Sequence, residues 1–137
     1  MNRACSKLIL EYNSLSPIST AISAVLMVAS MMPLTWGDAM AAIVGRRHGH
    51  YRYTVGGQSR SVEGSVAMLF WSWVTTSLAL FAMPYLVGRP AIHWLLALMY
   101  GGLVALVCTL VEALTPWGID NLTVPAAAVL VLYLLFI

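Results

Sequence analysis

The chain has 137 residues, of which 61% are hydrophobic and only 9% charged, and its mean hydropathy is +0.85. This composition excludes an ordinary soluble domain and is typical of a protein that crosses a membrane several times. The net charge of +2 is small, and no nucleic acid is expected as a partner. Cys5 and Cys108 lie in a polar tail and in an apolar run, so neither a disulfide nor a cysteine metal site is expected.

Long apolar runs define the expected organisation. A polar tail occupies residues 1–16, and one membrane domain is expected over 17–137. A helix needs roughly 20 apolar residues to cross a bilayer. The apolar runs are 17–36, 66–87, 91–114 and 123–137, of which the last is slightly short for a span. The first run continues with helix-compatible composition to Gly45. We therefore predict an all-α fold of about four transmembrane helices, with a basic, glycine-rich loop at 45–62 between the first and second.

A second interpretation of the N-terminal part is a signal peptide. Arg3, Lys7, the apolar run 18–34 and the small residues around Met40 resemble one loosely. The tail before this run is long and polar, and the run is long for the apolar core of a signal peptide. These features favour a retained helix.

Acidic residues gather at one predicted end of the bundle. The runs 66–87 and 91–114 form a hairpin around Arg89, so the chain returns to the side that it left, and the loops 45–62 and 115–122 share one membrane face. A carboxylate at mid-bilayer costs about 2.5–3.5 kcal/mol, which favours a polar site at that face. The charged residues concerned are Asp38, Glu63, Glu112, Asp120, Arg46, Arg47, Arg52 and Arg60. The positive-inside rule predicts that this face is cytoplasmic or stromal.

The order of four short motifs carries a resemblance. They are GDAMAAIVG at 37–45, GGQSRSVEGS at 56–65, the intramembrane Glu112, and DNLTVP at 120–125. In this order and spacing, residues 33–137 resemble the CTP-dependent polyprenol kinases, a family that includes dolichol kinase, phytol kinase and CTP-using diacylglycerol kinases. Phytol kinases are the most similar members. The resemblance implies transfer of a phosphoryl group from CTP or another nucleoside triphosphate to the hydroxyl of an isoprenoid alcohol such as phytol.

The chain departs from that family in two respects. Arg60 stands where the family usually has lysine; arginine keeps the charge and adds a bidentate fork for phosphate. Family members also carry further helices upstream, with a basic, histidine-containing motif, so this chain is expected to correspond to the C-terminal half. The N-terminal half as a second polypeptide, or another copy of this chain, is therefore an expected partner besides the lipid bilayer.

The basic loop is the candidate nucleotide site. Phosphoryl transfer needs charge neutralisation and positioning, which guanidinium groups and glycine-rich backbone supply. The predicted nucleotide-binding residues are Arg46, Arg47, Arg52, Gly56, Gly57, Ser59, Arg60, Ser61 and Glu63. The structural alternative is a topogenic loop that contacts anionic lipid. In that alternative Ser61 is the N-cap of the next helix and Glu63 is favoured by the helix dipole.

Oxygen-bearing side chains flank this loop. Asp38 and Glu112 are the predicted catalytic residues, and Asp38, Glu112, Asp120 and Asn121 are the predicted Mg²⁺ ligands, because hard cations prefer oxygen. Glu112 has no basic residue within four positions, so a cation or a distant arginine is its expected partner. Alternatively, Asp38 is an interfacial acid at a helix end. Likewise, Asp120 or Asn121 caps the last helix, with Pro125 in its first turn.

Two other functions compete with the kinase. One is a phosphatidate cytidylyltransferase-like enzyme that acts on a phospholipid. The other is a non-catalytic membrane paralogue or subunit that binds lipid, which the half-length chain favours. Retention of the four carboxylates at one end favours an enzyme.

Overall fold

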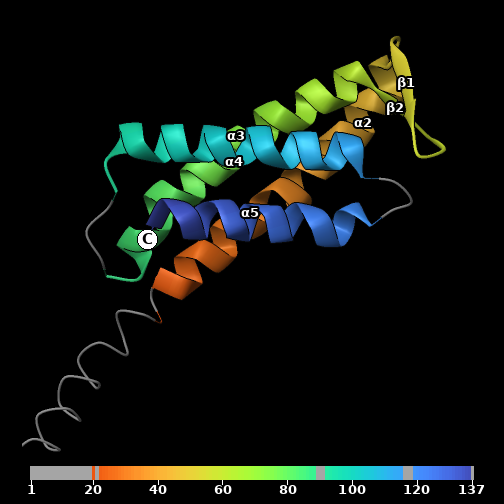
Figure 1. Cartoon of the computed structure of the whole chain (residues 1–137). Coiled ribbons are helices and arrows are strands. Elements are labelled where there is room, and N and C mark those ends of the chain that lie inside the picture. The colour runs from red at the N-terminus through yellow and green to blue at the C-terminus, as the bar shows by residue number, and fades with distance from the viewer. Residues whose placement is uncertain (1–19, 21, 89–91, 116–118, 137) are drawn as a thin grey trace, which may run out of the picture.

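A computed structural model describes residues 20, 22–88, 92–115 and 119–136. In chain order the labelled elements are η1 (Pro33–Asp38), α2 (Ala39–His48), β1 (Arg52–Val55), β2 (Gln58–Ser61), α3 (Val62–Leu86), α4 (Trp94–Leu114) and α5 (Asp120–Phe136) (Figure 1). Three helices are long and apolar enough to cross a membrane, namely Ile22–His48, Val62–Leu86 and Trp94–Leu114, and the apolar helix Asn121–Phe136 is shorter. The prediction of a helical, multi-pass protein is confirmed.

The first long helix contains a wide turn just before the predicted site. It runs from Ile22 to His48 and becomes a π-helix over Pro33–Asp38. Proline has no backbone N–H, so an ordinary α-helical hydrogen bond is lost at Pro33. Short π-helical segments inside α-helices often occur at functional sites. Here the segment ends at Asp38, the first acidic residue of the predicted site.

The segment predicted as a basic, glycine-rich loop over 45–62 contains the end of a helix and two strands. The α-helix continues to His48, and β1 and β2 then form an antiparallel hairpin in which Val55 pairs with Gln58. Gly56 and Gly57 make its two-residue turn with φ of 56° and 83°. Two successive positive φ values are typical of the type I′ turn, which matches the twist of the flanking strands and which glycine adopts without strain. The paired glycines therefore have a structural explanation in the turn.

The start of α3 agrees with the sequence prediction. The backbone N–H of Gly64 donates to Ser61 Oγ at 3.1 Å, so Ser61 is the N-cap of α3. Glu63 lies in the first turn, as expected. At the other end α3 stops at Leu86 and Gly88 has a φ of +71°. The tight turn predicted at Arg89 lies outside the described residues, as do the N-terminal tail and Cys5.

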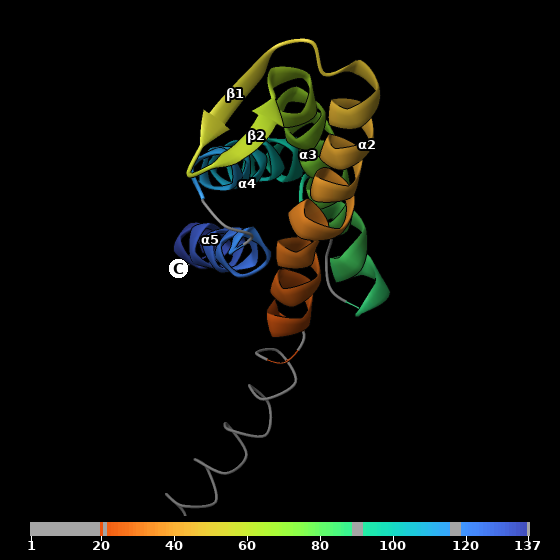
Figure 2. The ribbon, with the colours of Figure 1, turned by 90° about the vertical axis from the view of Figure 1, so that its right-hand side faces the viewer.

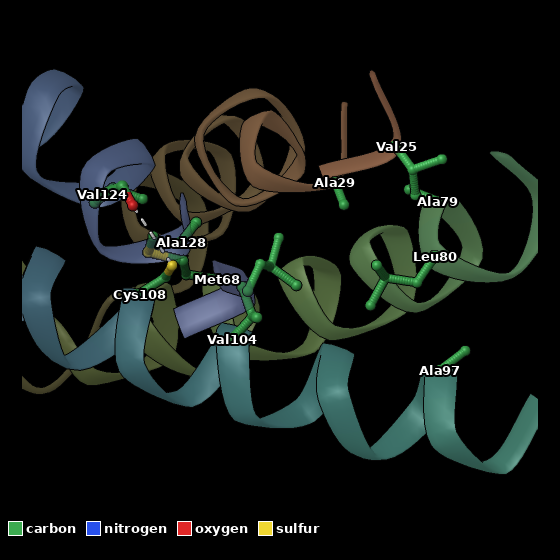
Figure 3. Close-up of a cluster of buried hydrophobic side chains, with 11 residues drawn as sticks. Val25, Ala29, Met68, Ala79, Leu80, Ala97, Val104, Cys108, Val124 and Ala128 are labelled. Atoms are coloured by element: carbon green, nitrogen blue, oxygen red, sulfur yellow. Dashed lines mark hydrogen bonds between the residues drawn. The ribbon is translucent and has the colours of Figure 1, made fainter. Parts of the chain in front are cut away.

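The last helix begins earlier than expected. It starts at Asp120, so Pro125 lies inside the helix beyond its first turn rather than within that turn. Cys108 of α4 donates from Sγ to the carbonyl oxygen of Val124 at 3.7 Å, in the core where α4 meets α5 (Figure 3). This contact ties the deep part of α4 to α5.

Helix α3 lies at the centre of the packing. It contacts η1 and α2 on one side and α4 on another, and α4 in turn packs along α5 (Figures 1 and 2). Interfaces between the helices hold small side chains, which let backbones approach closely in a membrane. A Cβ added to Gly64 would lie 3.0 Å from the carbonyl oxygen of Ala41 and 3.4 Å from Cα of Gly45. The small residues Ala41 and Gly45 of the first long helix therefore pack against α3.

The core is a layer of mostly small and medium apolar side chains drawn from all four long segments (Figure 3). Its buried members are Val25, Ala29, Met68, Ala79, Leu80, Ala97, Val104, Cys108, Val124, Ala128 and Leu132. Many larger apolar side chains, such as Leu78 and Leu130, are exposed on the outside of the bundle. An apolar exterior is the expected arrangement for helices surrounded by lipid.

The hairpin lies at the same end of the bundle as the last turn of α4 and the first turn of α5 (Figure 1). Arg60 of β2 donates from Nη2 to the carbonyl oxygen of Thr115, directly after α4, at 3.4 Å. The loops 45–62 and 115–122 were expected at one membrane face, because the chain returns to the side that it left. Arg60 and Thr115 bring these two segments into contact. This arrangement brings residues from four elements together at one end.

Candidate nucleotide-binding site

A pocket of about 320 Å³ lies between α2, the hairpin, α3 and α4. It is lined by Asp38, Ala41, Ala42, Gly45, Arg46, Arg52, Gln58, Ser59, Arg60, Ser61, Gly64, Ser65 and Glu112. The lining combines three guanidinium groups with two carboxylates and several hydroxyls. Such a mixture of convergent polar groups is typical of a ligand site rather than of a packing defect.

Helix α2 supplies one wall of the pocket. Asp38, Ala42, Gly45 and Arg46 follow one another at helical spacing, so they lie along one face. Arg46 donates from Nε to the carbonyl oxygen of Ala42 at 3.0 Å. This bond holds the guanidinium near the C-terminal end of α2, where a positive charge is also favoured by the helix dipole.

The hairpin is held in place over the pocket by contacts with α3. Glu63 Oε1 accepts hydrogen bonds from the backbone N–H groups of His50 and Tyr51, at 3.0 and 3.1 Å. The hydroxyls of Tyr53 and Ser65 are 2.7 Å apart. These contacts fix both the entry to β1 and its middle, so the arginines of the hairpin keep their position relative to α2.

Arg60 and Glu112 form a buried ion pair inside the pocket. Their side chains retain 11% and 10% of their exposed area. Arg60 also donates from Nη2 to Gln58 Oε1 at 3.5 Å and to the Thr115 carbonyl oxygen. The expectation that a distant arginine partners Glu112 is confirmed, since 52 positions separate the two residues. The pair links the hairpin to α4.

The structure brings together only part of the predicted site. Asp38, Glu112, Arg46, Arg52, Ser59, Arg60 and Ser61 all line the pocket. Predicted residues outside its lining are Arg47, Gly56, Gly57, Glu63 and Asn121. Arg47 is exposed near the end of α2, and the two glycines form the hairpin turn. Glu63 binds backbone N–H groups instead of lining the pocket, and the side chain of Asp120 lies outside the described part of the structure.

Two carboxylates, those of Asp38 and Glu112, line the pocket. Within residues 20, 22–88, 92–115 and 119–136, no group of three or more His, Cys, Asp or Glu side chains is close enough to hold a metal by itself. Mg²⁺ usually needs only one or two carboxylates together with substrate phosphates and water. The donor set therefore fits an Mg²⁺ ion that arrives with a phosphate ligand.

Several lining residues were not predicted as site residues. Gln58 and Ser65 come from β2 and α3, and Ala42 and Gly45 come from α2. Counting three, four and seven positions on from Asp38 along a helix would have identified the α2 residues. Ser65 and Gln58 have no comparable signal, because the hairpin that brings β1 against α3 was not predicted.

The chain is similar to known proteins over most of its length. It is 38% identical over 101 residues to a phytol kinase of Synechocystis sp., an overlap of 74% of this chain and 40% of that protein. This chain is homologous to phytol kinases. A probable chloroplastic phytol kinase 1 of Oryza sativa subsp. japonica is 36% identical over 111 residues, which are 80% of this chain and 35% of the rice protein. A probable chloroplastic phytol kinase of Triticum aestivum is 35% identical, over 80% of this chain and 36% of the wheat protein.

The phytol kinase homology thus covers most of this chain but a minority of each relative, since the chain spans about two fifths of their length or less. No family model and no solved structure matches the chain.

Proposed function

We propose that this chain forms the nucleotide-binding part of a membrane kinase that transfers a phosphoryl group from CTP, or another nucleoside triphosphate, to an isoprenoid alcohol such as phytol. The observation that carries this proposal is the pocket in which three arginines converge with Asp38 and Glu112 from the first long helix, the hairpin and α4. The homology to phytol kinases supports the reaction class and the acceptor.

The positions of the three arginines indicate where the triphosphate would bind in the pocket. Arg46 and Arg52 lie on exposed positions at the end of α2 and in β1, where the triphosphate arrives from water. Guanidinium groups bind phosphate oxygens through short, charge-assisted hydrogen bonds. Arg60 is already paired with Glu112, so its role is to hold the hairpin and to supply positive charge deeper in the pocket.

Asp38 is the proposed acceptor of the alcohol's proton. The alcohol oxygen forms a bond to the γ-phosphorus while the bond from that phosphorus to the bridging oxygen breaks, and CDP leaves with the bridging oxygen. The hydroxyl proton passes to the Asp38 carboxylate, a contribution of about 10²–10⁴-fold for a positioned base. Asp38 and Glu112 would hold Mg²⁺, which would neutralise part of the negative charge of the phosphates. This end of the bundle is proposed to face the cytoplasm or stroma, as the loop arginines indicate.

The proposal is tested by reconstituting the chain in proteoliposomes with γ-labelled CTP, MgCl₂ and phytol. The expected product is labelled phytyl phosphate, and Asp38→Asn is expected to abolish its formation while CTP still binds. A product that carries the cytidine nucleotide instead would indicate a cytidylyltransferase. Absence of any labelled lipid with CTP still bound, both for the chain alone and after addition of the N-terminal half as a second polypeptide, would refute the kinase and favour a nucleotide- and lipid-binding module.

A further inference from the structure

The pocket extends along the side of α2 rather than only beneath the hairpin. Its lining along the first long helix begins at Asp38, the last residue of η1, and ends at Arg46 of α2, an axial length of about 12 Å at 1.5 Å per residue. A carboxylate therefore marks one end and a guanidinium the other. Between them the lining side chains are only Ala41, Ala42 and Gly45.

Ala42 lies at the rim of the pocket. It lines the pocket and is also exposed, whereas Ala41 and Gly45 are half-buried toward α3. The pocket is therefore open along the side of α2 at Ala42. The opening lies on α2, which belongs to the apolar helix Ile22–His48, and this helix is long and apolar enough to cross a membrane.

At the end of the bundle, the hairpin blocks direct entry into the pocket. Its residues Arg52, Ser59 and Arg60 cover the pocket at the end of the bundle, and the Tyr53–Ser65 and Glu63 contacts hold it there. Figure 2 shows the hairpin beside the end of α2 and α3. A molecule dissolved in the bilayer would have to pass this polar cover to enter from the end, whereas the side opening presents Ala42, with the Arg46 guanidinium held beside it.

The size of the pocket limits what enters it. Its volume of about 320 Å³ is at the lower end of the range for small-molecule sites, about 300–1,000 Å³. A nucleoside triphosphate and a long isoprenoid chain do not fit together in this space. The chain of the acceptor must therefore remain in the bilayer while its hydroxyl end enters.

We propose that the opening at Ala42 is the acceptor subsite: an isoprenoid alcohol passes its hydroxyl end from the bilayer over Ala42 to Asp38, and the small side chain at position 42 sets the width of this opening. The acceptor's identity rests on the proposed kinase function. The subsite itself is a binding site for a membrane-dissolved primary alcohol and is measurable without turnover.

The adjacent residue provides a matched control. Ile43 is 43% exposed on the same helix and does not line the pocket. Ala42→Trp closes the proposed opening, whereas Ile43→Trp adds an indole at a position that contacts lipid only. Ala42→Leu is a milder variant that keeps the test valid should the tryptophan variant fail to insert.

The first readout is photolabelling in proteoliposomes with an isoprenoid alcohol that carries a diazirine near its hydroxyl. Label is expected in the segment 38–46 of the unmodified chain and of Ile43→Trp, and it is expected to disappear in Ala42→Trp and to decrease in Ala42→Leu. CTP binding is expected to be unchanged in Ile43→Trp, whose side chain lies outside the pocket lining. Equal labelling of the Ala42 variants, or labelling elsewhere only, would overturn the subsite.

Turnover separates the subsite from the kinase proposal. Phosphorylation of phytol is expected to fall by about 10²-fold in Ala42→Trp, comparable to the effect of a misplacement of about 1 Å. Phosphorylation of prenol, whose short chain has no tail to pass the opening, is expected to persist. Labelling at α2 without any turnover of either alcohol, with the N-terminal half also present as a second polypeptide, would refute the kinase and retain the subsite. Turnover that is equal for phytol and prenol in every variant would refute the subsite and retain the kinase.

Discussion

Loss of either partner of the Arg60–Glu112 pair is expected to destabilise the protein strongly. The two side chains are about nine-tenths buried, so a remaining charge would lack both water and its counter-ion. Removing one member of a buried pair costs about 3–5 kcal/mol, whereas an exposed pair contributes only about 0–1 kcal/mol. We expect about 3 kcal/mol for Arg60→Met and for Glu112→Leu, at the low end because the pair lines an open pocket.

The double variant distinguishes this explanation from a general loss of packing. With both charges removed no buried charge is left unpaired, and an apolar replacement of a buried pair is often neutral or stabilising. Arg60→Met/Glu112→Leu is therefore expected to be more stable than either single variant. Independent effects would instead add to about 6 kcal/mol.

The measurement is reversible unfolding in mixed micelles with increasing SDS, followed by tryptophan fluorescence and by circular dichroism. Single variants that each cost less than about 1 kcal/mol would refute the reasoning, because that is the cost expected of an exposed pair. A double variant with fully additive losses would refute it as well. The same pair makes Glu112→Gln a poor test of catalysis, since that variant leaves the Arg60 charge without its partner, and Asp38→Asn is the clearer substitution.

Further predictions concern the hairpin contact and the helix interfaces. Glu63→Ala is expected to speed hydrogen exchange of the backbone N–H groups of His50 and Tyr51, which precede β1. Glu63→Gln keeps an acceptor oxygen and is expected to preserve their protection. Equal exchange in both variants would argue against the contact. Gly101→Ala would place a Cβ 2.9 Å from the Ser77 backbone nitrogen and is expected to cost about 1–3 kcal/mol in the SDS titration. Gly102→Ala is its matched control, because the added Cβ would lie no closer than 3.3 Å to any atom of Trp73. A larger loss for Gly102→Ala would contradict the packing described here.

The sequence predicted the helices well because their signal is local. Apolar length placed α3 and α4 within a few residues of their observed ends, and the cap at Ser61 followed from its hydroxyl directly before an apolar run. The hairpin over 52–61 was missed. Its strands are short and rich in arginine and serine, and their stability depends on contacts with α3 that no local pattern encodes.

The candidate site was predictable as a set of residue types but not as a set of contacts. The expected hairpin of the runs 66–87 and 91–114 indicated that Arg60 and Glu112 lie at one end of the bundle, and the structure pairs them. No sequence pattern distinguishes Arg46, which lines the pocket, from Arg47, which is one position further and is rotated by about 100° around the helix. Glu63 shows the same limit, because its backbone partners at the start of β1 exist only once the hairpin has formed.

Binding of CTP to the purified chain in detergent micelles, measured by isothermal titration calorimetry, tests the central claim most directly. The account predicts a saturable site in the unmodified chain and in Arg47→Gln, whose side chain lies outside the pocket lining. Arg46→Gln and Arg52→Gln are each expected to weaken binding by about tenfold or more, since hydrogen bonds to charged groups contribute about 1.5–3 kcal/mol. Equal affinity in all four proteins, or an effect of Arg47→Gln alone, would contradict the assignment of this pocket to the nucleotide.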